Sequence, residues 1–527
     1  MVSTEVRTEP ALRSAFFLHT IVFVGGLTSI GIEIAASRLI APYFGNSTFI
    51  WANVIGLTLA YLSIGYYLGG KLADRYPSEI FLYSLTAIAA AFTGFIPFLA
   101  RPILNASLNA FDALSVGAFY GSLVAVILLF LVPITLLGCV SPLAIRLKLR
   151  GVEQAGNTAG SLYALSTIGS IAGSFLPVIV LIPFLGTYQT FYTLALLLLA
   201  VSILALARLR AAVPALVAAA LIAAVVLVAL FGARGVLRRP ESGTLLYEGE
   251  SEYNYIQVVQ NGDERDLVLN DGHATHSIYN PKQLLTEGPW DYFMIAPFFN
   301  ANERPADVRS LCLIGLAGGT TARQFTAVYG PIPIDGVEID PKIVQVGREY
   351  FDMTEPNLNV VIQDGRYFLK TTNRRYEVIG VDAYRQPYIP FQLTTKEFFQ
   401  EGYDHLTDDG VMVLNAGRFG TDYRLVNAVA TTMKAVFPHV YIVDVARFSN
   451  SMVIATKQPT TIGDFEANVS RLAPGSPLRV IGDLSISKGN IREWHGGGLV
   501  FTDNRAPVEQ VIDQIIINAA REETEQR

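Results

Sequence analysis

Acidic side chains follow several short apolar segments in the second half of the sequence. Glu338 ends the segment 334–338, Asp364 follows 360–362, and Asp382 follows 378–381. A carboxylate can accept hydrogen bonds from ribose hydroxyls or an amino group, anchor an ammonium group, or take a proton from it. If the apolar segments are neighbouring parallel strands, their carboxyl ends meet at one edge of a sheet and these acids share one ligand site.

A glycine-rich turn precedes the acids. The apolar segment 310–315 ends at Gly315, and Gly318 and Gly319 follow before a helical stretch that begins at Thr321. Glycines let the backbone approach a ligand, and a helix N-terminus favours negative or polar ligand groups. We therefore expect Gly315, Gly318 and Gly319 to line a cofactor site.

The spacing of the acids predicts their roles. Glu338 lies about 20 residues after the glycines, where an acid can accept hydrogen bonds from ribose hydroxyls. Asp340 precedes Pro341 and is expected to cap a helix. Asp364 is expected to bind an adenine amino group, with a simple Asp-Gly turn as the alternative, and Gly365 is expected to line the same cofactor site.

Asp382 is our first choice for a proton acceptor or amine anchor. His273 and His276 can do acid–base work at neutral pH, with ordinary loop hydrogen bonding as the alternative. Asp291 is a further carboxylate available for this work. An acceptor pocket is expected to be lined by Asp271, Tyr384, Arg385 and Tyr388.

The elements that must position these residues read as an α/β domain. Apolar segments at 310–315, 334–340, 360–364 and 378–382 are separated by helical stretches, a pattern typical of the Rossmann-type fold of NAD and S-adenosylmethionine domains. A small β region precedes them, with Asn261-Gly262 as its hairpin turn.

The first part of the sequence is of a different kind. The 527 residues have a mean hydropathy of +0.39, and the apolar residues crowd between Ala15 and Gly232. About 20 apolar residues cross the hydrocarbon core of a membrane, so we predict an all-α membrane bundle. The seven predicted spans are 15–40, 50–72, 80–100, 117–143, 158–184, 187–208 and 211–232.

Charge and cysteine content exclude other classes. The net charge of −6 argues against a nucleic-acid partner, and the two cysteines lie far apart in apolar runs, so no metal site is expected. Glu33 and Arg38 lie inside the first span and should face protein or water. They form either a structural pair or part of a substrate path.

Short motifs follow one another from about Leu245 onward, at 250–256, 269–272, 315–319, 337–340, 364–366, the strand ending at Asp382, 502–503 and 506–509. In this order they resemble the motifs of the spermidine synthase (polyamine aminopropyltransferase) family. The segments 276–279 and 382–390 resemble its membrane-fused branch, to which the sequence is most similar. Residues 69–75 resemble the loop after the second helix of major facilitator transporters, which indicates a half-transporter-like bundle.

The resemblance implies a reaction and its partners. Decarboxylated S-adenosylmethionine would act as co-substrate and give its aminopropyl group to a small amine or other small acceptor, with S-adenosylmethionine itself as the alternative ligand. No metal is implied. The lipid bilayer is the other expected partner, and the resemblance to dimeric soluble enzymes allows a homodimer.

Three departures from the family pattern concern the site. Gly318 stands where the family has an aspartate, and Arg385 stands where it has a second acid. The family's Tyr-His-Glu segment is missing near 290–294. A guanidinium suits a carboxylate or phosphate better than a diamine, so we expect a retained adenosyl pocket and a rebuilt acceptor pocket.

The sequence predicts a tail (1–14), a membrane domain (15–232), a linker (233–244), a β region (245–300) and a Rossmann-type domain (301–527). Basic loops and the basic tail belong in the cytoplasm. Seven spans then place the C-terminal domain outside, although its cofactor is made inside, so its side stays open. Two alternative functions are a methyltransferase for a membrane-associated acceptor and a non-catalytic polyamine transporter or sensor.

Overall fold

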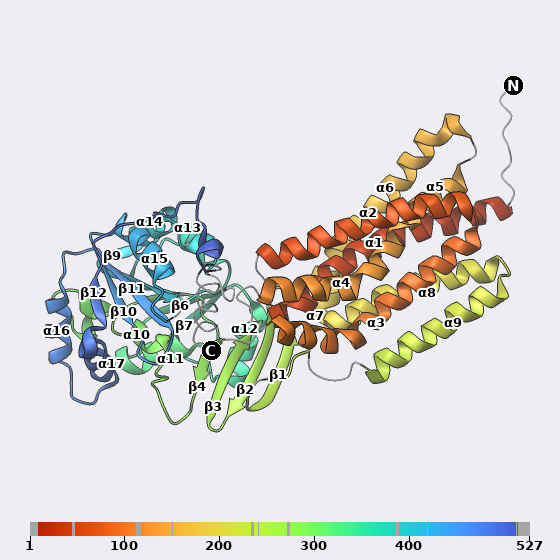
Figure 1. Cartoon of the computed structure of the whole chain (residues 1–527). Coiled ribbons are helices and arrows are strands. Elements are labelled where there is room, and N and C mark those ends of the chain that lie inside the picture. The colour runs from red at the N-terminus through yellow and green to blue at the C-terminus, as the bar shows by residue number, and fades with distance from the viewer. Residues whose placement is uncertain are drawn as a thin grey trace. The chain divides into compact units, whose positions relative to one another are not determined.

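The computed structural model describes residues 9–44, 48–111, 117–149, 151–232, 237–240, 242–270, 274–384, 389–418, 420–512 and 514. The chain divides into two compact units (Figure 1). The first comprises Met1–Asp112, Gly117–Arg239 and Gly249–Tyr255, and the second comprises Ala113–Val116, Pro240–Glu248 and Ile256–Arg527.

The first unit is a bundle of long apolar helices. Seven of its described helical segments are long and apolar enough to cross a membrane: Ala15–Phe44, Ile50–Arg75, Glu79–Ser107, Phe119–Lys148, Val152–Leu185, Thr187–Arg208 and Ala212–Leu230. These segments confirm the seven predicted apolar spans. The helices are α1 (Glu9–Phe44), α2 (Thr48–Arg75), α3 (Glu79–Phe111), α4 (Gly117–Gly138), α5 (Val140–Lys148), α6 (Ala155–Leu176), α7 (Ile182–Leu185), α8 (Thr187–Arg208) and α9 (Ala212–Leu227).

Glycines allow the helices of this unit to approach closely. A Cβ added at Gly65 of α2 would overlap the Thr135 carbonyl of α4, and one at Gly169 of α6 would overlap the Phe23 carbonyl of α1. Backbones can come this close only where one partner has no side chain. Gly65 and Gly169 therefore lie at contacts between helices.

Each of the two charged groups of the first predicted span has a partner outside α1. The Arg38 guanidinium donates to the Glu252 carbonyl within the same unit. Glu33 shares a hydrogen bond with the Thr58 side chain of α2. Both groups thus contact protein, as expected for charges inside an apolar span.

The second unit begins with a four-stranded sheet in the order β1-β2-β3-β4. Its strands β2 and β3 are antiparallel and flank the Asn261-Gly262 turn, as predicted. The strands are β1 (Thr244–Glu250), β2 (Tyr255–Asn261), β3 (Glu264–Leu269) and β4 (Thr275–Tyr279).

An eight-stranded sheet follows, in the order β12-β10-β11-β9-β8-β5-β6-β7. The pairs β5–β6, β5–β8, β6–β7 and β8–β9 are parallel, and β10, β11 and β12 add antiparallel pairs. The predicted Rossmann-type class is confirmed. The strands are β5 (Leu311–Ile314), β6 (Ile334–Glu338), β7 (Leu358–Ile362), β8 (Tyr376–Val381), β9 (Leu406–Gly417), β10 (His439–Asp444), β11 (Asn450–Thr456) and β12 (Ile491–Glu493).

Helices cover both faces of this sheet (Figure 1). Cys312 and Ile314 of β5 pack into one apolar cluster with α13–α15, whereas Leu311 and Leu313 pack into another with α11, α16 and α17. Burial on both faces explains why these strands are continuously apolar. The helices are α10 (Pro289–Phe293), α11 (Thr320–Tyr329), α12 (Pro341–Tyr350), α13 (Gly365–Thr371), α14 (Lys396–Asp404), α15 (Arg424–Lys434), α16 (Ile462–Ser470) and α17 (Pro477–Ile486).

Candidate functional site

The glycine turn after β5 brings the end of β8 against it. Gly315 has a φ of +92° and Gly319 a φ of +88°, which favour glycine. A Cβ at Gly315 would overlap the Asp382 carbonyl, and one at Gly365 would overlap the Ile314 side chain. The turn, Asp382 and the start of α13 therefore meet at the carboxyl ends of the strands.

Glu338, at the end of β6, is hydrogen-bonded to the same turn. The Ala317 N–H donates to its Oε2 (2.9 Å), and the Asp340 N–H donates to its Oε1 (3.1 Å). Burial raises the pKa of Glu338 to about 7, and the backbone hydrogen bonds lower it by less. Asp340 caps α12 by accepting from the Lys342 N–H (2.9 Å), which confirms its predicted structural role.

The small sheet closes one side of the turn through β4. The Gly318 N–H donates to Ser277 Oγ (2.8 Å), and a Cβ at Gly318 would lie 2.9 Å from the Ser277 Cβ. Thr320 both donates to and accepts from the backbone of Ile278. The Ser277 side chain thus leaves no room at position 318 for the aspartate of the family pattern.

His276 precedes this contact and is a weak proton acceptor. Burial lowers its pKa to about 4, so its imidazole is neutral at pH 7. Its Nε2 is buried without a hydrogen-bond partner among the described residues. This histidine is better suited to a hydrogen bond with a ligand than to general base catalysis.

Asp364 has a structural role at the start of α13. It accepts a hydrogen bond from the Tyr367 N–H (2.9 Å) as the N-cap. Its backbone lies beside that of Glu338, because β6 and β7 are parallel neighbours in register and the Gln363 N–H donates to the Glu338 carbonyl (3.0 Å). Asp364 therefore caps a helix rather than forming a simple turn, and it lies at the same sheet edge as Glu338.

Asp382 is held by two neutral donors. The Asn415 amide donates to its Oδ1 (2.9 Å), and the Trp290 indole also donates to the carboxylate. Burial raises the pKa of Asp382 to about 6, and these two hydrogen bonds lower it by less. A carboxylate with this pKa is mostly ionised at pH 7 and still able to take a proton.

The remaining predicted residues have other partners or are not described. The Tyr384 hydroxyl donates to the backbone carbonyl of Asn415 (2.9 Å), the residue that also contacts Asp382. Asp291 is fully buried and accepts from the backbone and hydroxyl of Thr286, the backbone of Glu287 and the amide of Gln324, so its carboxylate is occupied by structural bonds. Asp271, His273, Arg385 and Tyr388 lie outside the described residues.

Sequence reasoning missed three side chains of this site, namely Asn415, Trp290 and Ser277. Asn415 follows the apolar run 411–414 in the same way as the acids follow theirs, so the same signal was present. An uncharged amide was not among the side-chain types expected to do the chemistry. Trp290 and Ser277 carry no such local signal.

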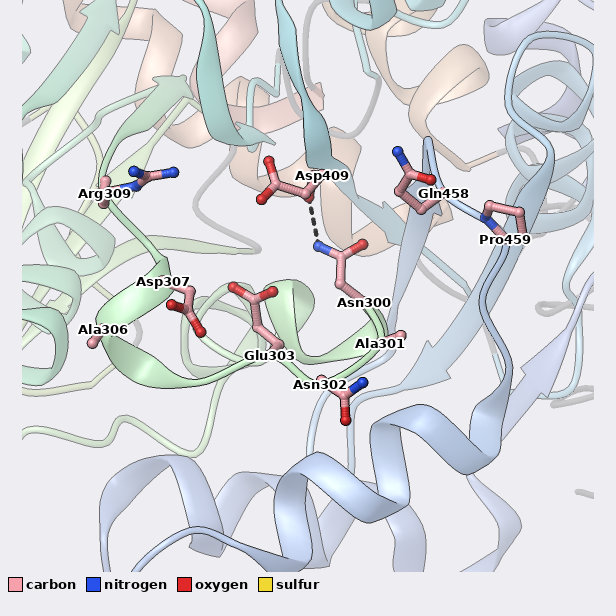
Figure 2. A pocket seen from close by; sticks show the side chains of 10 residues that line it. All are labelled: Asn300, Ala301, Asn302, Glu303, Ala306, Asp307, Arg309, Asp409, Gln458 and Pro459. Atoms are coloured by element: carbon pink, nitrogen blue, oxygen red, sulfur yellow. Dashed lines mark hydrogen bonds between the residues drawn. The ribbon is translucent and has the colours of Figure 1, made fainter.

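A hollow of about 450 Å³ lies at the opposite edge of the sheet (Figure 2). Burial and the neighbouring charges of Asp307, Asp409 and Glu377 raise the pKa of Glu303, at the rim, to about 7. Asp409 is near the start of β9 and Asp307 precedes β5, whereas the candidate site is at the strand ends. The hollow is therefore separate from the site. Its lining residues are Asn300, Ala301, Asn302, Glu303, Ala306, Asp307, Arg309, Asp409, Gln458 and Pro459.

No three His, Cys, Asp or Glu side chains gather to hold a metal ion within the part of the chain that the structure describes. The parallel strands and the groups at their carboxyl ends define a domain with the Rossmann-like architecture of methyltransferases. Its family is narrower than that. Residues 275–466 match the model of the spermine/spermidine synthase domain, so the C-terminal part of the chain carries a domain of this family.

Relatives agree with this assignment. A probable polyamine aminopropyl transferase of Bifidobacterium longum is 32% identical over 298 residues, covering 52% of this chain and 65% of that protein. A polyamine aminopropyltransferase of Vibrio vulnificus is 28% identical over 240 residues, covering 43% and 78%. The chain thus spans a little under two thirds of the first relative's length.

Solved structures that resemble this chain have lower sequence identities. A probable spermidine synthase from Corynebacterium glutamicum is 22% identical, with a TM-score of 0.37, covering 49% of this chain and 97% of that one. A spermidine synthase from Thermotoga maritima is 21% identical, with a TM-score of 0.36, covering 46% and 84%. The assignment of the domain depends on the sequence comparisons.

Proposed function

We propose that this protein is a membrane-attached aminopropyltransferase that uses decarboxylated S-adenosylmethionine as donor and a small amine as acceptor. The single observation that carries the proposal is the meeting of Glu338, the Asp364-Gly365 turn and Asp382 around the glycine turn after β5. The relatives named as aminopropyltransferases support the reaction class.

The donor would be held by its adenosine part. Glu338 would accept hydrogen bonds from the ribose hydroxyls, and Asp364 would accept one from the adenine amino group through the oxygen that does not cap α13. Gly315, Gly318 and Gly319 would let the backbone approach the ligand. His276 would offer its buried nitrogen to the ligand or to an ordered water.

Asp382 would act on the acceptor. The neutral amine attacks the methylene carbon beside the sulfonium, the carbon–sulfur bond breaks, and its electron pair stays on sulfur to give methylthioadenosine. The new nitrogen–carbon bond leaves the nitrogen positively charged, and Asp382 takes the proton that restores neutrality. Its pKa of about 6 suits this exchange. Asp271, His273, Tyr384, Arg385 and Tyr388 would shape the acceptor side.

Calorimetry on the full chain in detergent tests the donor. We expect binding of methylthioadenosine and decarboxylated S-adenosylmethionine, with weaker binding of S-adenosylmethionine, whose extra carboxylate would face Asp382. A preference for S-adenosylmethionine would favour the methyltransferase alternative, in which Arg385 suits an anionic acceptor. Absence of binding for all three compounds would defeat the proposal.

A transfer assay tests the chemistry. Formation of methylthioadenosine with putrescine, and its loss in Asp382→Asn, would support the proposed role. The Asn variant should still bind methylthioadenosine, because Asp382 is assigned to the acceptor. Polyamine flux into proteoliposomes without any product would instead favour the transporter or sensor alternative.

The seven apolar helices support attachment to a membrane. The proposed donor is made in the cytoplasm, so the C-terminal domain should face it, against the simple reading of the basic loops with seven spans. Accessibility of a cysteine introduced at exposed Glu349, with Cys139 and Cys312 replaced, decides the side. Labelling of intact cells by an impermeant maleimide would place the domain outside.

A further inference from the structure

A chain of neutral amides lies behind Asp382. Val381 of β8 is paired with Leu414 of β9, so the residues that follow, Asp382 and Asn415, are neighbours across the parallel pair. Asn415 is 4% exposed. Its Nδ2 donates to Asp382 Oδ1 (2.9 Å), and its Oδ1 accepts from the Nδ2 of Asn450 on β11 (2.8 Å).

The second amide fixes the direction of the first. If Asn415 were turned over, its oxygen would face the Asp382 carboxylate and its NH₂ group would face the NH₂ group of Asn450. Both contacts would be repulsive, and both would occur where few waters can relieve them. Tyr384 holds the backbone beside this amide, since its hydroxyl donates to the Asn415 backbone carbonyl (2.9 Å). Asn450 therefore ensures that Asn415 presents a donor to the acid.

We propose that Asn415, oriented by Asn450, is a positioning residue that holds the Asp382 carboxylate in one orientation toward the acceptor amine. The proposal rests on the function proposed above for Asp382. Neither amide needs to touch the substrate. Asn415 acts through the carboxylate, and Asn450 acts through Asn415.

The groups around Asp382 explain why the hydrogen bond from Asn415 affects the ionisation of this acid. The indole of Trp290, on α10, is the other hydrogen-bond donor to the Asp382 carboxylate. The Gly315 turn places its backbone against Asp382, and Tyr384, on the same loop as Asp382, is a titratable neighbour. Burial also raises the pKa of Tyr384 far above neutrality, so it stays uncharged. Arg385 lies outside the described residues. Among the described groups, hydrogen bonds rather than opposite charges therefore stabilise the ionised carboxylate.

The test removes each amide in the full chain and reads the ionisation of Asp382 in two ways. The first reading is the acid limb of the pH profile of kcat/KM for transfer. The second is the pH dependence of Trp290 fluorescence, taken as the difference between each protein and the same protein with Trp290→Phe. This second reading needs no activity, because the indole donates directly to the carboxylate.

In wild type we expect both titrations near pH 6, the pKa of Asp382. Asn415→Leu should move them upward by about one pH unit, because the acid loses one hydrogen bond to its charged form. Asn450→Ala should move them in the same direction by less, and it is the safer variant because Asn450 is less buried. Asn468→Leu is the control: Asn468 is equally buried but donates to the carbonyls of Phe298 and Asn300, so no shift is expected.

Unchanged Trp290 titrations in both Asn415→Leu and Asn450→Ala would overturn the proposal, as would an equal shift in Asn468→Leu. The failure of the proposed function looks different. In that case wild type transfers no aminopropyl group, while the fluorescence titration still moves in the two variants.

Discussion

Replacement of Glu338 by glutamine should change how the stability of the protein depends on pH. Glu338 is 7% exposed, and burial raises its pKa from 4.5 to about 7. Below pH 4.5 the carboxyl is protonated in both the folded and the unfolded chain, so the raised pKa does not lower the free energy of unfolding. Between pH 4.5 and 7 only the unfolded chain loses the proton, so folding becomes less favourable as pH rises.

The magnitude follows from the two pKa values. Their difference of about 2.5 corresponds to about 3–4 kcal/mol at roughly 1.4 kcal/mol per pKa unit, and the full cost is reached above pH 7. Most of it, about 2–3 kcal/mol, appears between pH 5 and pH 8. Glutamine does not titrate, so Glu338→Gln escapes this cost at every pH, although it loses one of the two backbone hydrogen bonds at every pH as well.

Thermal unfolding of the full chain in detergent measures the effect. The melting temperature of Glu338→Gln minus that of wild type should rise by about 5–10 °C from pH 5 to pH 8, at about 2–4 °C per kcal/mol for a domain of this size. Glu349→Gln, which removes an exposed carboxyl from α12, controls for the loss of one acid. A difference in melting temperature that stays constant with pH would refute the reasoning about Glu338.

The same variant should bind methylthioadenosine more weakly. Each hydrogen bond from a ribose hydroxyl to the charged carboxylate contributes about 1.5–3 kcal/mol, which is about 10–100-fold in affinity. Wild type should also bind more tightly at pH 8 than at pH 6, since the ligand prefers the ionised acid, and that gain should vanish in Glu338→Gln. A gain in stability without a loss of binding would show that Glu338 is a structural acid only.

Three further predictions concern other positions. Asp382→Asn should lower the transfer rate at least about 100-fold in stopped assays while methylthioadenosine still binds; an active Asn variant would remove Asp382 from the chemistry. Asp364→Ala should cost about 1 kcal/mol of stability by loss of the helix cap and also weaken adenosine binding, whereas Asp364→Ser should restore stability alone; equal binding in all three proteins would contradict the adenine role. Gly65→Leu should abolish folded, monodisperse protein in gel filtration because α4 leaves no space for a side chain, whereas Gly56→Ala, with open space around it, should behave as wild type; a well-folded Gly65→Leu would contradict the packing.

Local features of the sequence determined much of the architecture. Apolar runs long enough to cross a bilayer predicted all seven helices, because length and hydrophobicity are properties of a single segment. The same holds for the cap at Asp340, since Asp before Pro and a helical stretch specifies an N-terminus by itself. The acids at strand ends were also visible, because parallel strands bring their carboxyl ends to one edge.

Tertiary structure decided which of these groups are available for chemistry. The sequence also offered Asp291 as a carboxylate for acid–base work, yet it is occupied by donors from 286–287 and from Gln324, 33 residues away. The closing of the glycine turn by Ser277 spans 41 residues, and the amide of Asn415 lies next to Asp382 only because β9 is parallel to β8. The pKa of a carboxylate depends on burial and donors supplied by distant segments, so the sequence could place the acids but not assign their protonation.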